Sequence, residues 1–213
     1  MSDAAVKFEE SVAYMRNLIR QNVAGGFRDA NEIARSAVEA VAYGGIDPAP
    51  YEEEAERFLR ETLADHFQAQ TAWPDRTDCD RLDEAFAVLE ARGIICRQDF
   101  TCCGTCGHSE IGDEIAAAEE AGGTVRGYAF YHMQDTESAV DGGGLYLKYG
   151  AVAAGEATGV AVGRELAEVL TAHGLTTEWD GTLAQCVAVK LDWKRRRPLL
   201  AGFGCGVPRR PGN

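Results

Sequence analysis

The stretch GIICRQDF, residues 93–100, marks the point at which the sequence changes from helical to mixed patterning. A glycine is followed there by a short β-branched and apolar run, which is typical of a buried strand. Strand and helix patterns then follow one another to residue 193: a helix over 109–123, strands over 124–133 and 142–151, a helix over 156–173, and strands over 175–181 and 185–193. The second half of the chain is therefore predicted to be a sheet with helices.

This order of elements predicts an α+β fold. Strand, helix, strand, strand, helix and strand, with one extra strand, is the ferredoxin-like (split βαβ) arrangement, a sheet with two covering helices. Residues 1–92 instead carry apolar positions three and four apart, broken by glycine pairs, and predict an N-terminal helical region. We divide the chain into a helical region (1–92), a ferredoxin-like domain (93–196) and a basic tail (197–213) that we expect to be flexible. The alternative is one α+β domain that integrates the helical layer without a boundary near residue 92.

Composition excludes several classes of function. A net charge of -13 and a pI near 4.7 argue against binding to nucleic acid, which requires clustered Lys and Arg. Neither an export signal nor an apolar run of membrane length is visible, so we expect a cytoplasmic protein without membrane contact. Seven cysteines, an odd number, favour reduced thiols. The glycines at 142–144 lead into a strand and not a helix, so no nucleotide cofactor is expected.

The segment TCCGTCGH, residues 101–108, is the strongest candidate site. It lies between a predicted strand and the start of a helix, where the helix dipole stabilises a thiolate. Its four candidate metal ligands are Cys102, Cys103, Cys106 and His108. Cys103 and Cys106 form a C-x-x-C pair, the spacing at which two sulfurs converge on one zinc or other soft metal ion.

One feature of this ligand set is unfavourable. The adjacent Cys102 and Cys103 are expected to point in different directions, so Cys96 or His132 could supply a ligand instead. The leading hypothesis is a thiolate site for zinc or another soft metal ion, with a structural or regulatory role.

Two resemblances add to this interpretation. DFTCCGTCG resembles the metal-binding loop of heavy-metal-associated domains, although their usual GMTC is here DFTC; this resemblance implies soft-metal binding. DFTCCGTCG, YHMQDTE, GLYLKYG and WDG, in that order over residues 99–181, together resemble a bacterial family known only as a domain of unknown function. That second resemblance implies a recurrent module and no particular activity.

A second hypothesis makes the protein a thiol-dependent hydrolase or redox enzyme. Cys103 or Cys106 would be the nucleophile or redox thiol, His132 the base and Asp135 the residue that orients it. It requires the segment YHMQDTESAVDGGG (131–144) to meet the cysteine loop; the alternative for that segment is a polar hairpin with solvated acids. A third hypothesis is a protein-interaction module that binds a partner through the acidic helical region, and the oligomeric state stays open.

Overall fold

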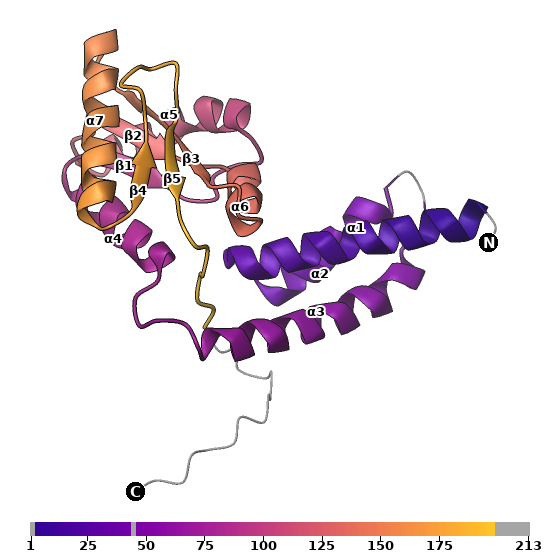
Figure 1. The fold of residues 1–213 in the computed structure, drawn as a ribbon. Coiled ribbons are helices and arrows are strands. Elements are labelled where there is room, and N and C mark those ends of the chain that lie inside the picture. The colour runs from indigo at the N-terminus through magenta and orange to yellow at the C-terminus, as the bar shows by residue number, and fades with distance from the viewer. Residues whose placement is uncertain (1–2, 44–45, 199–213) are drawn as a thin grey trace, which may run out of the picture. The chain divides into compact units, whose positions relative to one another are not determined.

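The computed structural model describes residues 3–43 and 46–198, which fall into two compact units. The helical unit comprises residues up to Trp73 together with the segment from Arg196, and the sheet unit comprises Pro74–Arg195. The helical unit contains α1 (Asp3–Gly25), α2 (Ala30–Val41) and α3 (Ala49–Gln70) (Figure 1). The sheet unit contains α4 (Asp78–Ala91), β1 (Ile94–Arg97), α5 (Gly104–Glu120), β2 (Gly127–Phe130), α6 (Met133–Val140), β3 (Leu145–Ala151), α7 (Glu156–Ala172), β4 (Thr176–Glu178) and β5 (Val187–Lys190).

The helical unit is closed by a residue from far along the chain. Its three helices bury apolar side chains spaced three and four residues apart in one core. Arg197 is buried and donates hydrogen bonds to the carbonyl oxygens of Asn22, Val23 and Arg28, at 2.9, 2.7 and 2.9 Å. The guanidinium thus binds two carbonyl oxygens in the last turn of α1, where helix carbonyls lack partners further along the helix, and one in the segment before α2. Arg197 opens the expected flexible tail, of which residues 199–213 lie outside the described residues.

Helix α4 belongs to the sheet unit. A reciprocal capping box begins it: Thr77 N–H donates to Asp80 Oδ2 at 2.7 Å, and Asp80 N–H donates to Thr77 Oγ1 at 3.2 Å. Its inner face packs in the same apolar core as β1 and α7, through Leu82, Ala85, Phe86 and Leu89. The predicted helical region, 1–92, is therefore divided after Trp73, because the fourth helix buries its apolar face against the sheet.

The described residues form one five-stranded mixed sheet in the order β1-β2-β3-β5-β4. β1 and β2 are parallel, and the other neighbouring pairs are antiparallel. The predicted α+β class is confirmed, whereas the ferredoxin-like detail is not. In a split βαβ unit another strand separates the two strands that a helix joins, but β1 and β2 are joined by α5 and pair directly. Periodicity identifies the strands and leaves their order open.

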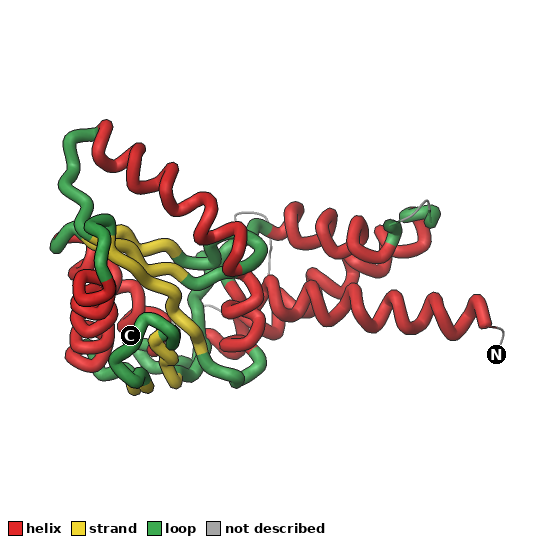
Figure 2. Tube along the Cα trace, turned by 90° about the horizontal axis from the view of Figure 1, so that it is seen from above, coloured by secondary structure: helices red, strands yellow, loops and turns green. Residues whose placement is uncertain are grey.

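The two faces of the sheet are covered by different helices (Figure 2). Successive residues of a strand point to opposite faces, so Ala129 packs with α4 and α7 while Phe130 packs with Ile111 of α5. The two helices expected to cover the sheet together, α5 and α7, thus lie on opposite faces. This arrangement places the first turn of α5 beside the ends of β1 and β2.

Gly107 sets how closely α5 approaches the sheet. A Cβ atom at this position would lie 2.4 Å from Cε2 of the fully buried Phe130, whereas a Cβ at Gly112 of the same helix meets nothing within 4 Å. We expect Gly107→Ala to lower the free energy of unfolding by roughly 1–3 kcal/mol through overpacking. Gly112→Ala should raise it by about 0.5–1 kcal/mol, because alanine is the better helix former. Urea unfolding of both variants measures the difference, and a stabilised Gly107→Ala protein would contradict this packing.

Candidate functional site

The cysteine loop meets the segment after β2. Because β1 and β2 are parallel, their carboxyl ends lie at the same edge of the sheet. Phe100 N–H donates to the Tyr131 carbonyl oxygen at 2.9 Å, and Met133 N–H donates to the Thr101 carbonyl oxygen at 3.2 Å. The two motifs that the sequence could not place relative to one another are therefore joined by backbone hydrogen bonds.

The loop between β1 and α5 is held in a strained conformation. Asp99 and Thr101 have φ angles of 51° and 60°, a left-handed region that a β-branched residue rarely adopts. Two side-chain hydrogen bonds stabilise it: Thr136 Oγ1 donates to Asp99 Oδ1 at 2.6 Å, and Thr101 Oγ1 donates to the Cys103 carbonyl oxygen at 3.1 Å. Such strain persists only where surrounding contacts enforce it, and it concentrates at functional sites.

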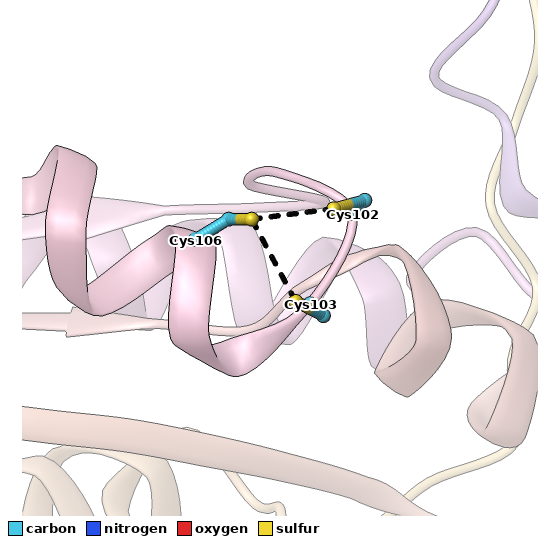
Figure 3. A group of neighbouring side chains, drawn as sticks. All are labelled: Cys102, Cys103 and Cys106. Atoms are coloured by element: carbon cyan, nitrogen blue, oxygen red, sulfur yellow. Dashed lines mark hydrogen bonds between the residues drawn. The ribbon is translucent and has the colours of Figure 1, made fainter.

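The three clustered cysteines converge on one point (Figure 3). Cys106 Sγ lies 3.5 Å from Cys102 Sγ and 3.7 Å from Cys103 Sγ, and all three sulfurs lie within 4.8 Å of one another. Two thiolates of a tetrahedral zinc site, each about 2.3 Å from the ion, are about 3.8 Å apart. Cys102 and Cys103 were expected to diverge, but the turn into α5 brings both sulfurs toward Cys106. The geometry can hold a single metal ion.

His108 and Cys96 do not join this group. The His108 ring packs against Phe130 and Tyr128, at centroid distances of 5.2 and 6.4 Å. Cys96 is buried in the core shared with α4 and α7, and its thiol donates to the Ile94 carbonyl oxygen at 3.5 Å. In the part of the chain that the structure describes, the convergent ligands are thus three thiols, one fewer than a closed tetrahedral site requires.

The pKa values of Cys103 and Cys106 are shifted in opposite directions at the start of α5. Cys103 is the N-cap residue. The backbone N–H of Cys106, the neighbouring thiols and the N–H of Thr105 lower the pKa of Cys103 from its ordinary value. The adjacent Cys102 and Cys103 thiols raise the pKa of Cys106 to about 11. Cys103 therefore loses its proton before Cys106 does, and it is the more nucleophilic of the two at neutral pH.

The segment after β2 is a helix and not a solvated hairpin. His132 is the N-cap of α6, and Asp135 closes a capping box by accepting from the His132 N–H at 3.0 Å. Asp135 is 6% exposed, and Lys148 of β3 donates to its Oδ1 at 2.7 Å. Sequence reasoning missed Lys148: its strand position predicts a polar face but does not identify a partner.

His132 has a defined tautomer. Its Nδ1 accepts the Asp135 N–H at 3.2 Å, so in the neutral ring the proton is on Nε2. Burial lowers the pKa of His132 and outweighs the Asp135 carboxylate, whose Oδ2 lies 3.1 Å from Nδ1. Among the described residues, no hydrogen bond joins this ring to a cysteine sulfur. The ring is therefore a neutral donor through Nε2, and the base–thiol pair of the enzyme hypothesis is not formed.

A known protein family matches most of this chain, including the cysteine loop and the segment after β2. The chain matches the family described as Domain of unknown function (DUF6891) over residues 9–197. It belongs to that family. The match covers both units of the DUF6891 chain, from α1 to the buried Arg197, so the helices and the sheet form part of one module. No curated protein and no solved structure matches the chain.

The helices of this DUF6891 protein do not have the length and apolarity of membrane spans in the part of the chain that the structure describes. Within residues 3–43 and 46–198, every helix is too short or too polar to cross a bilayer.

Proposed function

We infer that Cys102, Cys103 and Cys106 bind one ion of zinc or another soft metal, in a structural or regulatory role. The observation that carries this proposal is the convergence of the three sulfurs within 4.8 Å. Thiolate ligands select zinc, Cu(I) and iron–sulfur clusters. In a [4Fe–4S] cluster each cysteine binds a different iron atom, so sulfurs at 3.5 and 3.7 Å favour a single ion over such a cluster.

The number of ligands favours the regulatory role. Structural zinc sites are closed by four protein ligands, whereas sites that exchange or activate a ligand keep one position open. Cys102 is exposed and the other two thiols are half-buried, so an ion at the cluster is accessible to solvent and to competing ligands. The cytoplasmic location that we propose would keep these thiols reduced.

Metal analysis of protein purified without an affinity tag tests the proposal. We expect about one ion per chain in the wild type and a large loss in Cys106→Ser, because the Cys106 sulfur lies 3.5 and 3.7 Å from the other two. Cys186→Ser is the matched control, because this half-buried thiol lies outside the group and its removal should leave the metal content unchanged. Metal retained after all three clustered cysteines are changed to serine would disprove the site.

The lowered pKa of Cys103 supports a second candidate function, a reactive or redox thiol. In metal-free protein we expect iodoacetamide to label Cys103 first, and this labelling to persist at a lower pH than that of an ordinary thiol. Cys79 and Cys96 should react slowly, because burial raises the pKa of Cys79 to about 11 and that of Cys96 further. Mass spectrometry of timed samples gives the order, and uniform labelling of all thiols would count against a reactive Cys103.

A further inference from the structure

The N-cap residue of α5 makes no capping hydrogen bond through its side chain. Cys103 occupies this position, and the N–H groups of Thr105 and Cys106 lie near enough to favour its thiolate. The helix runs for 17 residues from Gly104, so its start carries the partial positive charge of a full helix dipole. Backbone N–H groups at such a helix start attract anions.

His132 supplies a second donor at the same place. Its side chain is 10% exposed, and within the described ranges its Nε2 has no hydrogen-bond partner. A Cβ atom at Gly104 would lie 3.6 Å from this Nε2, so the unpartnered N–H faces the first residue of α5. The ring is nine-tenths buried and held in place by the Asp135 N–H at Nδ1, so its Nε2–H is a fixed donor that a ligand at the start of α5 can use.

The surrounding charges are compatible with an anion. The same Gly104 position lies 3.8 Å from Lys148 Cε. The Lys148 ammonium neutralises the Asp135 carboxylate, and Asp99 accepts a hydrogen bond from Thr136. The Lys148–Asp135 pair therefore adds no net charge here, and the N-terminal residues of two helices, α5 and α6, lie next to each other.

We propose that a small oxyanion, a carboxylate or a phosphate group, binds between the first turn of α5 and Nε2 of His132. It fills the open fourth position of the metal ion, so this inference rests on the proposed function. Three thiolates and one anion around a divalent cation carry a net charge of about −2, the same as the common four-thiolate zinc site.

Loading the protein with cobalt(II) in place of the natural ion tests the metal site and the anion site in one experiment. Co(II) bound by thiolates gives a charge-transfer absorption, and its ligand-field bands report the fourth ligand. We expect the Co(II)-loaded wild type to show the thiolate absorption and its ligand-field bands to shift on titration with acetate or inorganic phosphate. The anion with the tighter binding identifies the ligand as a carboxylate or a phosphate.

Two variants locate the anion. His132→Asn keeps an N-cap side chain for α6 but removes the Nε2–H donor. Gly104→Ala adds a methyl in ordinary contact with His132 and covers this donor. Both proteins should fold, retain the cobalt–thiolate absorption and bind the anion roughly 10-fold more weakly or worse, because a hydrogen bond to a charged group is lost.

The outcomes separate the two proposals. Intact thiolate absorption without any response to acetate or phosphate overturns the anion site and leaves the metal site standing. An equal response in the wild type and both variants also overturns it, because the anion would then bind elsewhere. Absence of the thiolate absorption overturns the metal site itself.

Discussion

Lys148→Ala should lower the free energy of unfolding of the sheet unit by roughly 3–5 kcal/mol, the usual cost of leaving one member of a buried ion pair without its partner. The side chains of Lys148 and Asp135 are 15% and 7% exposed. The lysine ammonium also donates to the Tyr146 carbonyl oxygen at 3.2 Å. The truncation therefore strands a buried carboxylate at the N-terminus of α6 and frees a backbone acceptor.

A matched control lies on the same sheet. Lys190 of β5 pairs with Glu178 of β4, but these side chains are 67% and 62% exposed. Lys190→Ala should cost less than about 1 kcal/mol, as exposed ion pairs do. Urea unfolding followed by near-ultraviolet circular dichroism measures both variants, and equal costs would contradict the buried position of the Lys148–Asp135 pair. Combining Lys148→Met with Asp135→Asn should recover most of the loss, because no unpaired charge is left.

Arg197→Ala is expected to have the second large effect, a loss of roughly 3 kcal/mol or more from the helical unit. Its guanidinium satisfies the carbonyls of Asn22, Val23 and Arg28. Each hydrogen bond to a charged group contributes roughly 1.5–3 kcal/mol to stability. The total loss is smaller than the sum of the three, because water can replace the guanidinium at the carbonyl oxygens that it reaches. Gln70 also bonds the Arg197 backbone, and those bonds survive the substitution.

Hydrogen exchange measures this effect in the helical unit itself, because each amide reports the opening of its own segment. Amides of α1 should exchange faster in Arg197→Ala, while those of β3 stay unchanged. Arg60→Ala is the control: Arg60 pairs with Glu56 on the surface of α3, where both side chains are more than half exposed. Unchanged exchange in α1 of the Arg197 variant would show that the arginine does not hold this helix end.

The sequence predicted the elements of the fold better than their arrangement. Apolar spacing located eight of the nine described helices and strands of the sheet unit between residues 78 and 190, but it carried no information on strand order. Helix α6 was missed because MQDTESAV contains few apolar residues and begins with a histidine cap, an uncommon choice. The side on which α4 packs was missed for a similar reason, since an apolar stripe does not identify what covers it.

The site was predicted in part. Three of the four proposed ligands, Cys102, Cys103 and Cys106, come together. The C-x-x-C spacing at a helix start accounts for Cys103 and Cys106, whereas the turn that brings Cys102 to them was not predicted. His108 could not be excluded from spacing alone, since its ring turns toward aromatic residues of β2. Lys148 was not found, because a pair between a helix and the following strand, 13 residues apart, leaves no periodic pattern.

The return of Arg197 to the helical unit has a consequence for how the protein is made. The sheet unit, residues 74–195, is continuous in sequence, whereas the helical unit combines residues before 74 with a segment after 195. During synthesis, α1 to α3 leave the ribosome before the sheet unit, yet Arg197 is added only after β1 to β5 have been made. The sheet can therefore fold as soon as it emerges, while the first helices wait for their last contact, exposed to chaperones in the meantime.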